Sequence, residues 1–548
     1  MGSAGKLDIC FLYRRAAGVP IVRRRGQQVL LAMLSGVLLC LPWVDGSLYW
    51  TAWFGWLPLL CALQGVSPLR AALLGWLTGS LFYLGTAYWM VHFAIHLKGL
   101  SLPLSVLLAA LFWIYCGAAI GLGCLLYRWL ARRLPQLVLL SFPLSIVGVC
   151  ALFPGLFDIR FSETQAAFLI AIQGADVVGA QGMDLLILLV NGLLFQLLAG
   201  VRGRVASALA ATGAVLVLVW FVYGWQALAH WDAEVANWQR MRVGLVQPND
   251  APTRRIPAPP AGYSRQYPEE MEASRRLAAA GARWVVWPEA RYKGYFDHQS
   301  VRQAYADQVL AMGADLLFHD VEARNRHAEP ISYNTMGWLR RDGELAERYR
   351  KMLRVPFGEY LPAFWQLPGI STLTHAVLGD YLRPVGAGDV HTRFAIDGMQ
   401  VVPKICYETA FPEFIADAIG DEVSGAVLLF VSQDNWFGET SQPFQHRAIS
   451  IMRAVENRVP MVHLINNGPS VAAAPSGRPL AGTPAFSRAE LLVDLPYSVS
   501  AQASFYGRHA HRLGRLWLAM LAALILLAIL LVRRQGRDAG TAEVHGTR

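Results

Sequence analysis

The stretch RFAIDGMQVVPKICYE, residues 393–408, holds two apolar runs separated by Asp397-Gly398 and closes on a cysteine. Asp-Gly between two apolar runs is a strong β-hairpin signal, because both residues accept the positive φ angles of a tight turn. The second run therefore predicts a buried strand with Cys406 at its end. Free cysteine is among the most buried residue types, so Cys406 taken alone favours a core thiol over a nucleophile.

The chain around this stretch alternates strand-like and helix-like segments. Helical stretches lie, for example, at 264–281 and 444–458. Alternating strands and helices predict an α/β domain with a buried sheet over residues 229–512. The segments that read as strands are 241–248, 282–290, 314–320, 333–340, 426–436 and 461–468.

The rest of the chain is too apolar for an ordinary soluble protein. Hydrophobic residues make up 55% of the 548 residues and charged residues 16%, whereas soluble proteins carry about 25% charged residues. A bilayer core needs about 20 apolar residues per helix. We therefore predict a membrane domain of about seven helices at 28–228 and a C-terminal transmembrane helix at 513–532. The candidate spans are 28–44, 49–64, 71–92, 102–127, 136–154, 182–200, 205–228 and 513–532.

The positive charges predict which way the helices run. The formal net charge is +10, and the arginines cluster in short segments between apolar runs, which indicates membrane topology rather than a nucleic-acid-binding stripe. The arginine clusters precede the first span and follow the second, fourth, sixth and eighth spans. If the count of spans is right, all of these clusters lie on the same side of the membrane. The positive-inside rule makes that side cytoplasmic. Residues 1–27 are then a basic cytoplasmic N-terminus, 533–548 a cytoplasmic tail, and 229–512 an extracytoplasmic domain.

Six of the seven cysteines lie before residue 229, and Cys406 is the only one between residues 229 and 512. That domain therefore cannot form an internal disulfide. It also lacks the paired CxxC spacing of a zinc site, so the sequence predicts no metal there.

Three motifs place reactive side chains just past strand-like runs. VVWPEA contains Glu289, YRKMLRVPFGEYLP contains Lys351 and Glu359, and KICYE contains Cys406. Each also has an ordinary structural explanation, since Glu289 could cap a helix and Lys351 could lie on a solvated basic face.

Taken together, the motifs resemble the nitrilase superfamily, whose Glu-Lys-Cys triad matches Glu289, Lys351 and Cys406 in order and context. With the predicted spans, the chain is similar to the apolipoprotein N-acyltransferases, the membrane-embedded branch of that superfamily. The resemblance implies an αββα sandwich outside the bacterial cytoplasmic (inner) membrane. The motifs that carry it are WPEA, VPFGEYLP, ICYE, DNWFG, QHRAISIMRAVENRVP and NNG.

The resemblance implies a role for each triad residue. Glu289 would take the thiol proton and later pass it to the leaving group. Lys351 would favour the thiolate and stabilise the oxyanion, with the backbone N–H of Tyr407 as a second donor. The family also implies four supporting residues. Glu359 would orient Lys351. Tyr407 and Glu408 would shape the site, and Asn334 would lie near it.

The implied reaction has two half-steps and needs no metal or organic cofactor. Cys406 takes a fatty acyl chain from a phospholipid and releases a lysophospholipid. The thioester is then attacked by the α-amine of the diacylglyceryl-cysteine that begins a lipoprotein. Water must be kept out between the two steps, because hydrolysis would turn the enzyme into a lipase.

Some positions depart from the family pattern and keep other functions open. The tryptophan usual after Phe153-Pro154 is missing, Leu353 stands where histidine is common, and Gln433 replaces the usual asparagine. One alternative is a related membrane acyltransferase with a different amine acceptor. Another is a membrane-anchored amidase or nitrilase, which would use the same triad. The intact triad argues against a non-catalytic scaffold.

Overall fold

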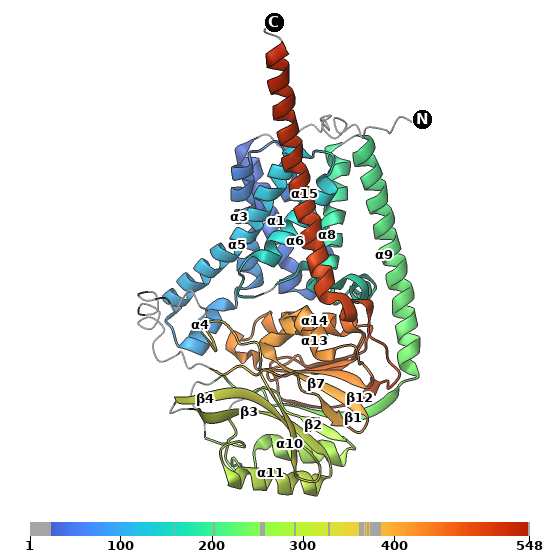
Figure 1. Cartoon of the computed structure of the whole chain (residues 1–548). Coiled ribbons are helices and arrows are strands. Elements are labelled where there is room, and N and C mark those ends of the chain that lie inside the picture. The colour runs from blue at the N-terminus through green and yellow to red at the C-terminus, as the bar shows by residue number, and fades with distance from the viewer. Residues whose placement is uncertain are drawn as a thin grey trace.

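The structure is a computed structural model that describes residues 24–157, 159–200, 203–252, 258–289, 292–326, 329–360, 367, 369, 372 and 385–545. Residues 1–23 of the predicted N-terminal segment and 546–548 of the predicted tail lie outside the described residues. The described chain forms a helical part stacked on a part built from β-sheets (Figure 1).

Five helices of the helical part are long and apolar enough to cross a membrane, namely α1, α5, α8, α9 and α15. The apolar α6 is shorter, at 15 residues, and α3 has 19. The multi-pass membrane domain expected from the composition is therefore present. The α-helices are Arg25–Val44 (α1), Leu57–Ala62 (α2), Pro68–Thr86 (α3), Met90–Lys98 (α4), Leu102–Arg133 (α5), Val138–Leu152 (α6), Leu169–Ile172 (α7), Ala175–Ala199 (α8), Arg204–Ala236 (α9) and Phe505–His545 (α15), and the 3₁₀ helices are Gly46–Trp53 (η2) and Phe161–Gln165 (η3).

The second predicted span, 49–64, is not one continuous helix. The chain returns through the bundle as η2 followed by the short α2, with a break between them. Asn191 of α8 compensates the break, because its side chain accepts a hydrogen bond from the Trp56 N–H (2.9 Å) and donates to the Ala52 carbonyl (3.0 Å). Backbone that leaves the helical pattern at membrane depth must be satisfied by other protein groups.

Several arginines of α3 and α5 lie at the end of the bundle away from the sandwich, whereas Arg508, Arg512 and Arg515 lie at the start of α15, next to the sandwich (Figure 1). Arg70, in the first turn of α3, donates to the Gln28 side chain near the start of α1 (2.9 Å). Arg128 and Arg132, late in α5, both donate to the Val66 carbonyl (3.4 and 3.1 Å). The start of α1 and the end of α15 lie at this end, away from the sheets (Figure 1).

The second part is a sandwich of two six-stranded sheets, with strand orders β12-β1-β2-β3-β4-β5 and β11-β10-β9-β8-β7-β6. Their facing sides bury one apolar core, which includes Val243 of β1 and Ile405 of β7. The strands are Gln239–Gln247 (β1), Trp284–Val286 (β2), Asp315–Arg326 (β3), Glu329–Leu339 (β4), Leu345–Arg350 (β5), Phe394–Ile396 (β6), Met399–Ile405 (β7), Ala426–Ser432 (β8), Met461–Ile465 (β9), Val471–Ala473 (β10), Pro479–Gly482 (β11) and Ala489–Tyr497 (β12).

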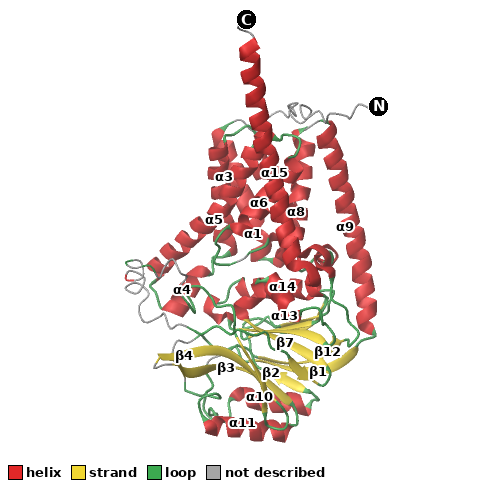
Figure 2. Cartoon of the chain, viewed as in Figure 1, coloured by secondary structure: helices red, strands yellow, loops and turns green. Residues whose placement is uncertain are grey.

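Helices cover the outer face of each sheet (Figure 2). Glu269–Ala279 (α10) and Gln299–Met312 (α11) pack on the first sheet, and Pro412–Ile419 (α13) and Gln442–Asn457 (α14) pack on the second. This is the αββα sandwich that the resemblance implied. The α13–α14 layer lies between the second sheet and the membrane helices (Figure 1).

The Asp397-Gly398 hairpin is confirmed. Strands β6 and β7 pair antiparallel with Ile396 opposite Met399, and both turn residues have positive φ angles, 47° and 88°. Beyond the turn, β7 runs parallel to β8, and β8 runs parallel to β9. Cys406 therefore lies where a buried parallel strand ends.

Buried ion pairs join the α14 layer to the membrane domain. Arg453 is fully buried and contacts Glu163 of η3 (3.0 Å) and Glu456 of its own helix (2.8 Å). Arg458 contacts Asp176 of α8 at 2.9 Å. Because buried charges are costly unless they are paired, these contacts hold the two parts in one relative position.

Candidate active site

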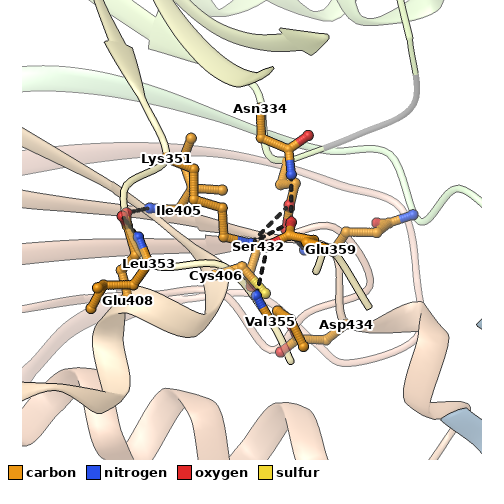
Figure 3. A network of polar contacts seen from close by, with 12 residues as sticks. Asn334, Lys351, Leu353, Val355, Glu359, Ile405, Cys406, Glu408, Ser432 and Asp434 are labelled. Carbon is orange, nitrogen blue, oxygen red and sulfur yellow. Dashed lines mark hydrogen bonds and ion pairs between the residues drawn. The ribbon is translucent and has the colours of Figure 1, made fainter. Parts of the chain in front are cut away.

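The three triad side chains come together from three strand ends. Glu289 lies three residues past the end of β2, Lys351 follows β5 directly, and Cys406 follows β7 directly. Figure 3 shows Lys351 and Cys406 facing each other, with Glu359 beside them. The sequence places these residues far apart, and the sandwich brings their strand ends to one point.

Lys351 is the central cation of the site. It is 1% exposed, and its Nζ lies 2.9 Å from Glu359 Oε1 and 3.8 Å from Glu289 Oε1. Burial lowers the pKa of Lys351, but Glu359 and Glu289 together raise it, so that the pKa lies above its usual value. The ammonium therefore stays charged between the two carboxylates.

The charges around Cys406 favour the protonated thiol at rest. Burial raises the pKa of Cys406 well above its usual value, and Glu289 adds to the rise while Lys351 opposes it. The Glu289 side chain lines the same cavity as the thiol, and burial raises its pKa. A thiol of this kind needs a base at the moment of attack, and Glu289 is in place to be that base.

The backbone at Cys406 is strained. Its φ angle is +51°, in the left-handed region that residues with a side chain rarely adopt. The turn lets Cys406 begin the 3₁₀ helix Cys406–Ala410 (η6) directly after β7.

Glu359 holds Lys351 through contacts of its own. One oxygen accepts a hydrogen bond from the Asn334 side chain (2.6 Å), and the other accepts from the Val355 N–H (2.8 Å). Asn334 thus lies next to the site. Its side chain reaches the Lys351 ammonium through Glu359, and its backbone carbonyl accepts a hydrogen bond from the Lys351 N–H (2.9 Å).

Glu408 lies two residues past Cys406 and is fully buried. It accepts hydrogen bonds from the Tyr349 hydroxyl and the Met352 N–H (both 2.7 Å). It also accepts from the N–H groups of Leu353 (3.1 Å) and Ile405 (2.8 Å). The carboxylate therefore ties the lysine segment to the strand that carries Cys406 (Figure 3).

Tyr407 reaches from the sandwich to the membrane domain. Its hydroxyl donates to the Leu156 carbonyl at 2.5 Å, and its ring packs edge-on against Phe157 and Phe411. The loop that lacks the usual tryptophan therefore still contacts the residue next to Cys406.

The triad faces a partly open cavity between the two parts of the chain, and the empty space there, including the part open to solvent, is about 980 Å³. Its catalytic-domain side includes all three triad residues, and its membrane-domain side is almost wholly apolar. The membrane-domain residues that line it are Trp43, Trp89, Phe93, Leu97, Phe157 and Ile159.

Gln433, which departs from the family pattern, contacts the site through its backbone, because its N–H donates to Glu289 Oε2 (3.1 Å). Two further residues at the site were not singled out from the sequence. Asp434 and His446 form a pair behind Cys406. Both lie in motifs that carried the family resemblance, DNWFG and QHRAISIMRAVENRVP, and that was the signal that could have pointed to them.

Two family models match the chain in succession. The apolipoprotein N-acyltransferase N-terminal domain matches residues 35–193, and the carbon-nitrogen hydrolase domain matches residues 242–504. The first covers membrane helices and the second covers the sandwich.

Curated relatives named apolipoprotein N-acyltransferase match this chain over most of their length. The relative from Geobacter metallireducens is 29% identical over 92% of this chain and 95% of its own. The relative from Azotobacter vinelandii is 29% identical over 95% of this chain and 98% of its own. Among solved structures, an amidase of the nitrilase superfamily from Nesterenkonia is 20% identical, with a TM-score of 0.36 over 52% of this chain and 98% of the amidase.

Proposed function

We propose, because the chain belongs to the apolipoprotein N-acyltransferase family, that it moves a fatty acyl chain from a phospholipid to a lipoprotein through a thioester on Cys406. The acceptor is the N-terminal amine of a diacylglyceryl-cysteine. The supporting observation is that Cys406 faces a cavity walled on one side by membrane-domain aromatic residues. An enzyme that hydrolyses small soluble amides has no need for such a wall.

In the first half-reaction, Glu289 takes the proton of the Cys406 thiol while sulfur attacks the ester carbonyl carbon of the donor. The oxyanion is stabilised by Lys351 Nζ and the Tyr407 N–H. The intermediate collapses by breaking the carbon–oxygen bond to glycerol, and Glu289 returns the proton to the departing alkoxide. The products are an acyl-thioester and a lysophospholipid.

In the second half-reaction, the lipoprotein amine attacks the thioester carbon and Glu289 takes a proton from the attacking nitrogen. Lys351 again stabilises the oxyanion. The carbon–sulfur bond breaks, and the proton from Glu289 restores the thiol. The product is an amide, and the enzyme returns to its starting state.

The cavity walls explain why the acceptor is an amine rather than water. The aromatic residues on the membrane-domain side exclude water from the thioester, which keeps hydrolysis slow. An acceptor anchored in the bilayer reaches the thioester without crossing the aqueous phase.

A second cavity supports a phospholipid as the donor. It has an empty volume of about 1100 Å³ and shares Phe157, Ile159 and Tyr407 with the first. Its lining is apolar along α5 and α6 and polar at Arg160, Gln181 and Glu413. A donor with two acyl chains and a polar headgroup suits two adjoining cavities of this kind.

Purified full-length protein, mixed with phospholipid vesicles and a diacylated lipopeptide, is expected to yield triacylated lipopeptide and lysophospholipid in equal amounts. Intact mass before addition of the lipopeptide should show one acyl group on the protein. The variant Cys406→Ser should show neither acyl-enzyme nor product. Acyl-enzyme without acylated lipopeptide would point to another amine acceptor, and hydrolysis of small amides without acyl-enzyme would point to an amidase.

We also propose that the sandwich lies outside the cytoplasm, because the arginines near the short loops next to α3 and α5 lie at the opposite end of the bundle. A reporter that is active only outside the cytoplasm should be active when fused after residue 236, at the end of α9. The same reporter fused after residue 134, past the end of α5, should be silent. The reverse pattern would overturn the proposed topology.

A further inference from the structure

A histidine and an aspartate form a buried pair directly behind the nucleophile. Asp434, in the 3₁₀ helix Asp434–Phe437 (η7), is fully buried, and His446 of α14 is 7% exposed. The two carboxylate oxygens lie 2.9 and 3.2 Å from His446 Nδ1. Among the described residues, His446 is the only hydrogen-bond partner of this carboxylate. A buried carboxylate with one partner is stabilised most when that partner is a cation.

The other ring nitrogen faces oxygen atoms as well. His446 Nε2 lies 3.2 Å from the Cys406 carbonyl oxygen and 2.5 Å from Thr409 Oγ1. The Thr409 hydroxyl lies 2.7 Å from the same carbonyl and donates to it. A hydroxyl has one proton, so when that proton is donated to the Cys406 carbonyl, the hydrogen between Nε2 and Thr409 comes from Nε2.

We propose that His446 is a positively charged positioning residue that holds the carbonyl of Cys406, with both ring nitrogens donating. Nδ1–H binds the Asp434 carboxylate, and Nε2–H binds the Cys406 carbonyl and the Thr409 hydroxyl. The cation fixes the strained peptide at Cys406 and compensates a carboxylate that otherwise disfavours the thiolate. This inference rests on the proposed role of Cys406 as the nucleophile.

The neighbouring groups agree with this charge state. Burial lowers the pKa of His446, whereas Asp434 and, to a smaller extent, Glu289 raise it. The rise outweighs the effect of burial, so the pKa lies above its usual value. Asp434 in turn raises the pKa of Cys406. His463 of β9 packs edge-on against His446 with ring centroids 4.5 Å apart. It binds two serine hydroxyls, Ser432 and Ser450, and its pKa is lowered by burial and by His446.

The protonation state is testable without any lipid. In full-length protein labelled with ¹⁵N-histidine in detergent, we expect the His446 ring to show two protonated nitrogens at neutral pH. In Asp434→Asn it should show one, because the counter-charge is gone. A neutral His446 ring in the unchanged protein, with Nε2 accepting from Thr409, would overturn the proposal whatever the lipid chemistry proves to be.

The positioning role is testable by the pH profile of acyl-enzyme formation. In His446→Gln the amide still offers a donor but no charge, and we expect the rate to fall by about 100-fold, as for a small misplacement of a reacting group. The unchanged enzyme should lose rate at high pH as His446 loses its proton, and this loss should be absent in His446→Gln.

The matched control is His511→Gln. His511 also binds an aspartate, Asp417, at 3.0 Å, but on the exposed surface of the described structure, so its replacement should change neither the rate nor the profile. Equal alkylation of Cys406 by iodoacetamide in denatured samples will show that all variants contain the thiol. A His446→Gln enzyme with the rate and pH profile of the His511→Gln control would also overturn the proposal.

Discussion

Replacing Lys351 by methionine is expected to slow acyl-enzyme formation by at least about 100- to 1,000-fold, the usual effect of losing one oxyanion donor. The structure gives a reason to expect a rate loss near the upper end of this range. Lys351 lies between Glu289 and Glu359, so its removal leaves two neighbouring carboxylates without their shared cation. The pKa of Glu289 then rises, so a smaller fraction of this carboxyl is ionised and able to take the proton of Cys406.

The measurement is the time course of acyl-enzyme by intact mass, recorded from pH 5 to pH 9. Lys351 lowers the pKa of Glu289, so in Lys351→Met the rise of rate with pH should move to higher pH. Lys404→Met is the matched control, because Lys404 is also fully buried but packs over the rings of Tyr349 and Phe414, outside the cavity. A Lys351→Met enzyme that acylates as fast as Lys404→Met would refute the oxyanion role.

Replacing Arg453 by methionine is expected to destabilise the whole protein by about 3–5 kcal/mol, the usual cost of breaking a buried ion pair from one side. Arg453 is the fully buried cation between Glu163 of the membrane domain and Glu456 of α14. Without it, two buried carboxylates remain at the contact between the two parts. The loss should appear as a lower thermal unfolding midpoint of the full-length protein in detergent.

Two comparisons separate this effect from ordinary loss of charge. Arg478→Met breaks an exposed pair with Asp232 and should cost no more than about 1 kcal/mol. The double variant Arg453→Met with Glu163→Gln should recover part of the loss, because one of the two buried negative charges that faced Arg453 is removed. If Arg453→Met is as stable as Arg478→Met, the buried network does not hold the two parts together.

The sequence was sufficient for features that depend on local chemistry. The turn at Asp397-Gly398 needs residues that tolerate positive φ angles, and the Asp-Gly dipeptide alone predicts it. The predicted runs at 241–248, 426–436 and 461–468 correspond to β1, β8 and β9 because buried parallel strands leave uninterrupted apolar stretches. The proximity of Glu289, Lys351 and Cys406 was expected from the family resemblance, and their positions at strand ends allow it.

Features that depend on distant partners were not predictable in this way. The break at 49–64 is stable because Asn191, in another helix, satisfies the freed backbone groups. The residues near Trp56 in the sequence do not predict Asn191 as its partner. The same holds for His446, whose role depends on a carbonyl 40 residues earlier in the chain. Short strands such as β10 and β11 also carry too few residues to show a period.

The aromatic wall of the first cavity has a consequence for inhibition. A molecule designed to reach the thiol meets Trp43, Trp89 and Phe93 from the bilayer domain on one side of the cavity. Its potency will therefore depend on how strongly it partitions into lipid as well as on how well it fits. Apparent inhibition constants should fall as the alkyl tail lengthens and rise when the lipid or detergent volume of the assay is increased. Screening the isolated sandwich in buffer would select compounds for a surface that the intact enzyme does not present.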